Sequence, residues 1–318
     1  MSTDVCSQMM QMKCYAPELG CALGNMELSS CPNWTGSSAA VVANGIEVAD
    51  ILLPWSGNAM GLSDLTFVSG RAKPITVGIV GPGNAGKTTV LASWYLLLGK
   101  GLLLKNDWRF GGSYSLGGWE AVASALTFKP GQSPTFPPHT TSRNARAPGL
   151  LHIALRRQNG RLRDFVFADA PGEWFKNWSV DQEAEDATGA RWVASHADVL
   201  LLVADREALS GPRLGTARSA FQLLAKRVAA NRRGRPVALV WTKGDITVDP
   251  EMEDSIRRAV ANDMPDFREF SVSVYPVDRE VGVGFRELFA WVTQTRRPGV
   301  GSMQCSTVVD PLFMIGRR

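Results

Sequence analysis

Residues 75–88 read Ile-Thr-Val-Gly-Ile-Val-Gly-Pro-Gly-Asn-Ala-Gly-Lys-Thr, and this stretch decides the fold. The apolar, β-branched run at its start predicts a buried strand over 75–80, and the amphipathic run after it predicts a helix over 88–98. Between the two lies the pattern G-x-x-x-x-G-K-T. Strand, glycine loop and helix in this order are the context of a P-loop, which binds the phosphates of a nucleotide.

The residue types of this loop match that role. Glycines let the backbone turn tightly, so that successive N–H groups point inward at phosphate oxygens, and the following helix presents its positive end to the same anion. Lys87 is expected to reach the β- and γ-phosphates, and the Thr88 hydroxyl to ligate Mg²⁺. The loop residues expected to hold the nucleotide are Gly81, Gly83, Asn84, Ala85, Gly86, Lys87, Thr88 and Thr89.

Composition narrows the class of protein. The chain has 318 residues, of which 45% are hydrophobic, enough for one large domain with a substantial core. A net charge of +4, carried mostly by scattered arginines, gives no strong nucleic-acid signal. No run reaches the roughly 18 apolar residues of a membrane span, and no secretory signal is visible. We therefore expect a cytoplasmic protein without structural disulfides.

Sequence character divides the chain into four parts. A small Cys-containing segment covers 1–40, a lead-in linker covers 41–73, one α/β unit covers 74–296, and a short tail covers 297–318. Within the α/β unit, strands and helices are expected to alternate, which favours a mostly parallel sheet with helices on both faces. The further strands are expected over 151–156, 164–168, 199–203, 237–241 and about 270–277, and the further helices over 117–126, 181–195, 214–230, 251–261 and 284–295.

Two features qualify this pattern. Asn159-Gly160 separates two of the strands and predicts a hairpin, which makes one edge strand antiparallel. A Gly- and Pro-rich excursion over about 105–148 interrupts the alternation and is expected to contain a nucleotide-sensitive loop.

A second nucleotide-binding element follows the strand over 164–168. It reads Asp169-Ala-Pro-Gly172. An acidic residue at the carboxyl end of a strand beside a P-loop can hold a Mg²⁺ water, and a glycine three residues later can offer its N–H to the γ-phosphate. The alternative is a helix N-cap followed by a Pro-Gly turn.

The third element, Thr242-Lys243-Gly244-Asp245, follows the strand over 237–241. A carboxylate accepts two hydrogen bonds from the N1–H and 2-amino groups of guanine, a pair of donors that adenine lacks. The stem of Lys243 can lie along the base, whereas Thr242 stands where Asn is usual. Ser273 is a candidate for a loop that touches the guanine O6, with Ser271 as the alternative.

A threonine that closes over Mg²⁺ is expected between the first helix and residue 151. Thr135, Thr140 and Thr141 are the candidates, and Thr140 is favoured. The alternative reading of the whole set is an ATP-using enzyme in which Thr242-Lys-Gly-Asp245 occurs by accident.

With these elements in order, residues 74–296 resemble the TRAFAC class of P-loop GTPases, and the antiparallel edge strand is the arrangement of Ras-like domains. The N-terminal cysteines, Leu53-Pro54-Trp55 and Asp169-Ala-Pro-Gly-Glu173 look further like the bacterial double-GTPase family of the second type. This resemblance implies GTP binding and hydrolysis, often beside partner proteins in prokaryotic conflict or defence systems. We therefore expect a Mg²⁺-dependent GTPase that switches a protein partner, or else a binding module with little hydrolysis.

Two positions bear on hydrolysis. Glu173 stands where Ras-like proteins often carry the glutamine that orients the attacking water, and it either positions that water or forms a salt bridge elsewhere. Asn84 resembles the P-loop Asn of potassium-stimulated GTPases, where K⁺ contacts the phosphates. The alternatives are an Asn that suits the loop conformation, and a positive charge supplied by Arg143 or Arg146.

Cys6, Cys14, Cys21 and Cys31 are the right number for a tetrahedral Zn²⁺ site. Their spacing contains no C-x-x-C pair, which weakens the zinc signal and favours ordinary free thiols. A metal would supply folding energy to a polar segment with little core of its own.

Overall fold

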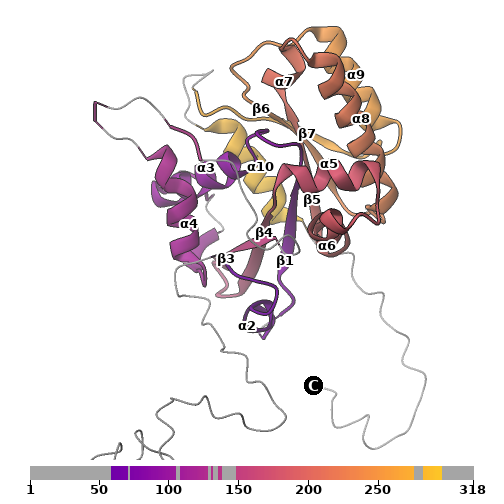
Figure 1. Cartoon of the computed structure of the whole chain (residues 1–318). Helices are drawn as coiled ribbons and strands as arrows, with labels where there is room; N and C mark the ends of the chain where they lie inside the picture. The colour runs from indigo at the N-terminus through magenta and orange to yellow at the C-terminus, as the bar shows by residue number, and fades with distance from the viewer. Residues whose placement is uncertain are drawn as a thin grey trace, which may run out of the picture. The chain divides into compact units, whose positions relative to one another are not determined.

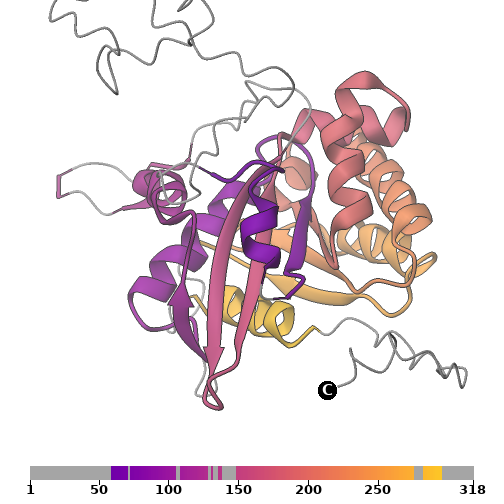
Figure 2. The same cartoon turned by 90° about the horizontal axis from the view of Figure 1, so that it is seen from below.

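The computed structural model shows a seven-stranded sheet between two layers of helices (Figures 1 and 2). All of the elements belong to one compact unit, Leu52–Arg318. The structure describes residues 59–70, 72–104, 108–127, 130–131, 135–137, 148–275 and 282–295.

The sheet is mostly parallel and carries its antiparallel pairs at one edge, as expected. Its order is β2-β3-β4-β1-β5-β6-β7. β1 lies at the centre and pairs in parallel with β4 and β5, while β3 runs antiparallel to both β4 and β2. The strands are β1 Ile75–Val80, β2 Trp108–Gly112, β3 Gly149–Arg157, β4 Leu162–Asp169, β5 Val199–Asp205, β6 Val237–Thr242 and β7 Arg268–Ser271.

The hairpin between β3 and β4 is confirmed, with Gly160 at φ +79° in the turn. β2, however, lies inside the stretch over 105–148 and was not predicted. Its sequence Trp-Arg-Phe-Gly-Gly is short and ends in two glycines, and the pairing with β3 shifts register between Phe110 and Gly112. Pairing to an existing edge, rather than local propensity, makes this strand.

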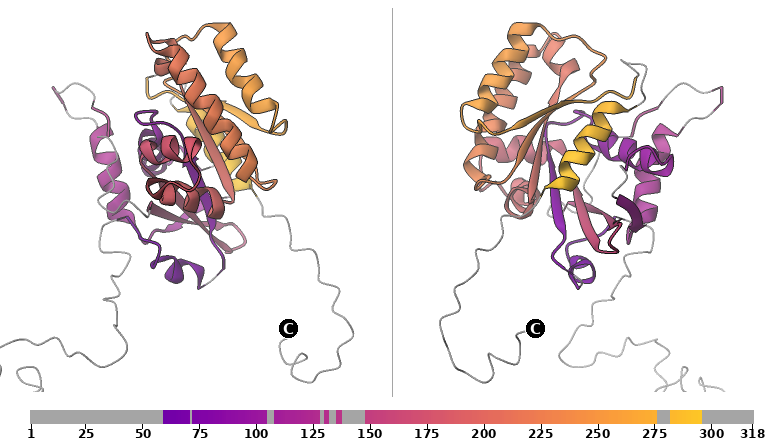
Figure 3. Two further views of the ribbon diagram at one scale, coloured as in Figure 1. Left: turned by 45° about the vertical axis from the view of Figure 1, so that its right-hand side comes forward. Right: turned by 180° about the vertical axis from the view of Figure 1, so that it is seen from behind.

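Helices cover both faces of the sheet (Figure 3). α5, α6, α8 and α9 pack on one face, and α3, α4 and α10 on the other, each over its own apolar cluster. No helix in the described ranges is long and apolar enough to cross a membrane. The α-helices are α2 Leu65–Ser69, α3 Lys87–Gly99, α4 Leu116–Ala123, α5 Gly172–Val180, α6 Thr188–His196, α7 Arg206–Ser210, α8 Leu214–Asn231, α9 Pro250–Ala261 and α10 Val283–Gln294, with 3-10 turns over Ser124–Leu126 and Glu185–Ala187.

The face under α3 and α10 is packed by aromatic rings. Trp94 of α3 lies 5.5 Å from Phe167 of β4 and 5.3 Å from Phe289 of α10, measured between ring centroids. The Trp94 indole N–H donates to the Phe285 carbonyl at 2.9 Å, so this buried polar group is satisfied. The contacts fix the helix that follows the glycine loop against the sheet.

The prediction of one helix over 181–195 is wrong. A helix starts directly at Gly172, ends at Val180, and is followed by a 3-10 turn and then by α6. Pro171 takes the N-cap position, so the Pro-Gly pair begins a helix instead of a loop. Trp174 and Trp178 of α5 are buried at 5% and 1% exposure, because they join the core on this face.

Close packing between α5 and α6 generates a stability prediction. A Cβ atom at Gly189 of α6 would lie 2.0 Å from the Trp174 ring, so Gly189→Ala forces the two helices apart. We expect a loss of about 1–3 kcal/mol in the free energy of unfolding, the usual range for overpacking. Gly215→Ala in α8 is the matched control, because nothing lies within 4 Å of its Cβ position. Urea unfolding of both variants checks this; equal stabilities would contradict the packing described.

Candidate functional site

The glycine loop links β1 to α3 at the carboxyl edge of the sheet. Gly86 precedes the helix at φ +80°, a left-handed conformation that side chains with a Cβ rarely adopt. Asn84 takes φ +59° in the same loop. Asn tolerates this conformation better than most residues, so the backbone alone accounts for its presence.

The loop is in close contact with the start of α5. A Cβ atom at Gly172 would lie 2.0 Å from the Gly83 amide nitrogen and 2.3 Å from the Pro82 carbonyl carbon. Only glycine fits at this position without moving one backbone or the other. The Asp169-Ala-Pro-Gly172 element therefore lies directly against the glycine loop.

Lys87 rests on its own loop. Its Nζ donates to the carbonyl oxygens of Gly81 at 3.1 Å and Pro82 at 2.8 Å, and lies 5.9 Å from the centroid of the Phe175 ring. Burial lowers the pKa of Lys87 to about 8, and the nearby carboxylates Asp169 and Glu173 act in the opposite direction. The amine is thus a buried positive charge whose partners are chiefly neutral groups.

The donor set for a divalent cation is oxygen-rich. The Thr88 hydroxyl lies 3.1 Å from Oδ2 and 3.4 Å from Oδ1 of Asp169, which is 8% exposed. Hydroxyl and carboxylate oxygens suit Mg²⁺, which takes one or two protein ligands and completes its shell with water and phosphate. In the described ranges, no group of three or more His, Cys, Asp or Glu could hold a metal alone. The residues present therefore fit Mg²⁺ bound together with a nucleotide.

Thr242 faces the glycine loop. Its hydroxyl lies 2.8 Å from the Ala85 carbonyl oxygen and 3.3 Å from that of Ala204, and the residue is 3% exposed. The side chain that stands in the usual position of Asn therefore binds the phosphate loop and the end of β5. This contact needs only a short hydroxyl, which explains how Thr serves at this position.

Lys243 is held by two carboxylates. Its Nζ lies 2.9 Å from Asp205 Oδ2 and 2.7 Å from Glu207 Oε2. Burial lowers the pKa of Lys243, but the hydrogen bonds that its ammonium donates to Asp205 and Glu207 outweigh burial and raise the pKa overall. Its backbone takes φ +55°, which turns the chain sharply between β6 and Asp245.

Asp245 lies exposed at the other end of this turn. The Ser273 hydroxyl donates to its Oδ1 at 2.6 Å, and the Gly244 amide donates to the Val272 carbonyl at 3.0 Å. A Cβ atom at Gly244 would lie 2.9 Å from the Ser271 hydroxyl. The segment after β7 thus supports the acidic residue, and Ser273 rather than Ser271 binds its side chain.

One cavity of about 510 Å³ joins these groups. Residues 84–90, Gly172, Thr242, Lys243 and Asp245 are among the residues that line it. A volume of this size suits a nucleotide-sized ligand. The structure therefore brings together the three elements that the sequence analysis identified separately.

Among the remaining predicted residues, Thr135 does not line the cavity and donates from its hydroxyl to the Ala125 carbonyl oxygen. The others fall into three groups. Gly81, Asp169 and Ser273 contact cavity residues without lining the cavity. Gly83 and Glu173 line a neighbouring cavity of about 250 Å³ between the loop, α5 and α8. Outside the described residues lie Thr140, Thr141, Arg143, Arg146, Cys6, Cys14, Cys21 and Cys31.

Several groups at the site were not predicted from the sequence. Asp205 and Glu207 hold Lys243, and the aromatic residues Phe136 and Tyr275 line the cavity with their rings 6.3 Å apart. Asp205 did carry a signal, since it ends a buried apolar strand at the same edge as Asp169. Phe136 and Tyr275 carried none, because only the folded chain brings their two loops together.

The chain was compared with known proteins and with solved structures. No curated protein matches the chain. A solved chain described as Methanosarcina barkeri Roco2 RocCORdC bound to GDP is similar at 14% identity and a TM-score of 0.35. The match covers 69% of this chain and 48% of that one, so it spans less than half of the larger protein.

The sequence profile of the family described as Double-GTPase 2 matches residues 75–292, which begin with β1 and its glycine loop and end within α10. All of the cavity residues named above lie within this range. The match supports a P-loop protein that binds guanine nucleotides. The chain belongs to the Double-GTPase 2 family.

Proposed function

We propose that the protein is a Mg²⁺-dependent GTPase that acts as a nucleotide-dependent switch toward a protein partner, in a prokaryotic conflict or defence system. The observation that carries the proposal is the cavity shared by the glycine loop and Asp245. A triphosphate on the loop would direct its base toward Asp245, whose carboxylate can discriminate guanine from adenine.

Base recognition would depend on Asp245. Its carboxylate can accept from both N1–H and the 2-amino group of guanine, whereas adenine offers no such pair. Ser273 donates to one of its oxygens, which leaves the other oxygen and further lone pairs for the base. The ATP-using alternative gains no support from this arrangement.

Phosphate binding would depend on Lys87, Thr88 and Asp169. Lys87 would exchange its two loop carbonyls for phosphate oxygens, and loop amides would supply further donors. Thr88 and Asp169 would hold Mg²⁺, which supplies neutralisation of the developing charge during phosphoryl transfer. The Gly172 amide is the candidate sensor for the γ-phosphate, because it lies against the loop.

Two candidate functions differ in whether the protein hydrolyses GTP. Glu173 lies in the first turn of α5 and lines the neighbouring cavity instead of the nucleotide cavity. An ionised Glu also cannot donate to a water and adds negative charge near an anionic transition state. These observations favour, as a second candidate function, a GTP-binding module with little intrinsic turnover, in which Glu173 does not position water.

Two roles also remain for Asn84. Its left-handed backbone is a sufficient reason for an Asn, and a bound K⁺ at its amide oxygen is the alternative. We expect equal GTP turnover in KCl and in NaCl of the same concentration. A clearly faster rate in KCl would assign the cation role to Asn84, and Asn84→Ala should then lose the difference.

We expect Asp245→Ala to lose its preference for GTP over ATP, with GTP affinity reduced about 10–100-fold because two hydrogen bonds to a charged group are lost. Lys87→Ala should weaken both nucleotides. Binding titrations measure each Kd, and Asp263→Ala is the control, an exposed acid outside the cavity. GTP preference that survives in Asp245→Ala would contradict the proposal, and turnover of the wild type separates the two candidate functions.

The pKa of Lys87 gives a second test. Phosphate favours the charged amine, so binding above pH 8 must take up a proton and affinity must fall as pH rises. For a pKa of about 8 we expect uptake of about 0.1 proton at pH 7 and about 0.8 at pH 8.5. Calorimetry in two buffers of different ionisation enthalpy measures it, with Lys176→Met as control. The same uptake at both pH values would refute the role of Lys87.

A further inference from the structure

Three consecutive residues at the end of β5 and the start of α7 lie against the loop that carries Asp245. Asp205 and Glu207 bind the Lys243 ammonium, at the beginning of that loop. Arg206 Nη1 lies 3.5 Å from the Ile246 carbonyl oxygen, directly after Asp245. The segment thus contacts the loop on both sides of its acidic residue.

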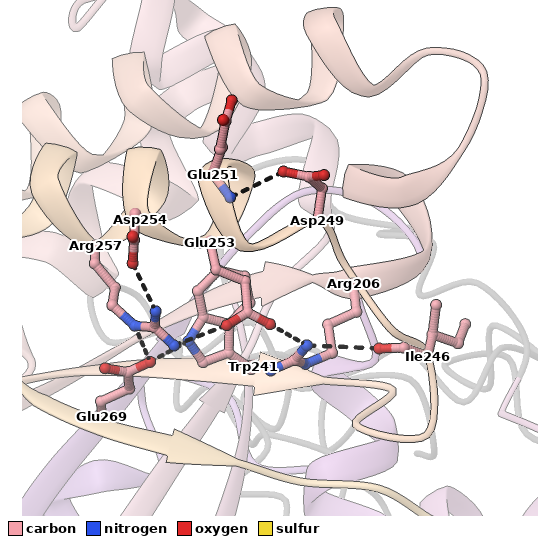
Figure 4. A network of polar contacts seen from close by, with 9 residues as sticks. All are labelled: Arg206, Trp241, Ile246, Asp249, Glu251, Glu253, Asp254, Arg257 and Glu269. Carbon is pink, nitrogen blue, oxygen red and sulfur yellow. Dashed lines mark hydrogen bonds and ion pairs between the residues drawn. The ribbon is translucent and has the colours of Figure 1, made fainter.

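Arg206 is itself fixed by other contacts (Figure 4). Its Nη1 donates to Glu253 Oε1 of α9 at 2.5 Å, and its guanidinium lies 5.1 Å from the centroid of the Trp241 ring. The Arg206 side chain is 14% exposed and that of Glu253 is 17% exposed, so solvent screens this pair less than a surface pair. Its Nε is buried and has no hydrogen-bond partner among the described residues.

The surrounding groups form one frame, drawn in Figure 4. The Trp241 indole N–H donates to Glu269 of β7 at 2.7 Å, and Arg257 of α9 binds Glu269 and Glu253, each at 2.8 Å. Arg257 also lies 6.0 Å from the centroid of the Trp241 ring. Arg206 and Arg257 therefore share a ring and a carboxylate, but between them only Arg206 contacts the loop.

The loop needs such support. Asp245 is exposed, and Lys243 before it has a backbone conformation that costs energy for a residue with a Cβ. Two hydrogen bonds to a flat base require the carboxylate within about 0.5 Å of the productive position. A planar guanidinium suits this task because it can hold Glu253 and Ile246 at once, which a lysine ammonium does less well.

We propose that Arg206 is a positioning residue for guanine recognition: by holding the Ile246 carbonyl from the Glu253–Trp241 frame, it fixes the direction of the Asp245 carboxylate. The inference rests on the GTP binding proposed above. It predicts that Arg206 acts on the discrimination between bases and leaves phosphate binding unchanged.

Inosine triphosphate is the diagnostic ligand, because its base keeps N1–H and lacks only the 2-amino group. We expect Arg206→Met to lower the ratio of GTP to inosine triphosphate affinity about tenfold, with inosine triphosphate affinity itself changed less than about threefold. Arg257→Met, the matched control, removes the same kind of ion pair and ring contact and should keep the wild-type ratio. Titration of the full-length wild type and of both variants with each nucleotide gives the six affinities needed.

The outcomes distinguish guanine recognition by Asp245 from the positioning role of Arg206. A wild-type ratio near one would refute recognition of the guanine 2-amino group by Asp245, and with it the two-bond recognition of guanine proposed above. A wild-type preference for GTP that is unchanged in Arg206→Met would overturn the positioning role alone, as would an equal loss in both variants, because the effect would then belong to the Trp241 packing. If Arg206→Met does not fold, Arg206→Lys replaces it, since it keeps the positive charge and lacks the planar fork.

Discussion

The hydroxyl of Thr242 joins the glycine loop to the end of β5, beside the loop that carries Asp245. It lies within hydrogen-bond distance of the Ala85 carbonyl in the glycine loop and of the Ala204 carbonyl in β5. β5 and β6 pair in parallel up to Asp205 and Thr242, so both strands end at the same level. Without this contact the distance between the glycine loop and the loop of Asp245 would be set less tightly.

Much of this arrangement followed from the sequence because parallel strands end at a common edge. β1, its glycine loop and α3 have strong local signals, and the alternation of strands and helices placed Asp169 and Thr242 beside them. β2 and α5 were not predicted, because each depends on tertiary contacts that local sequence does not reveal. The double glycine of β2 favours a break unless an edge pairs with it, and Pro171-Gly172 favours a turn unless aromatic residues bury the helix that follows.

Lys87 and Lys243 also show which features of the site the sequence does not predict. Both were predicted from motifs, yet their surroundings differ in ways that only the fold determines. Lys87 is buried against carbonyl groups and has a lowered pKa, whereas Lys243 meets two carboxylates and has a raised one. Lys87 is therefore the amine still able to gain an anion. Lys243 already has its countercharges, and its ammonium serves mainly to hold its own loop.

The burial of α5 limits how the protein can respond to its nucleotide. Trp174, Phe175 and Trp178 are all almost inaccessible to solvent, although they come directly after the glycine that lies against the phosphate loop. Exposing each ring would cost about 1.5–3 kcal/mol, so melting this segment would use up much of the stability of an ordinary domain. Any movement that begins at Gly172 must therefore move α5 as a rigid body, together with α6, which packs against it.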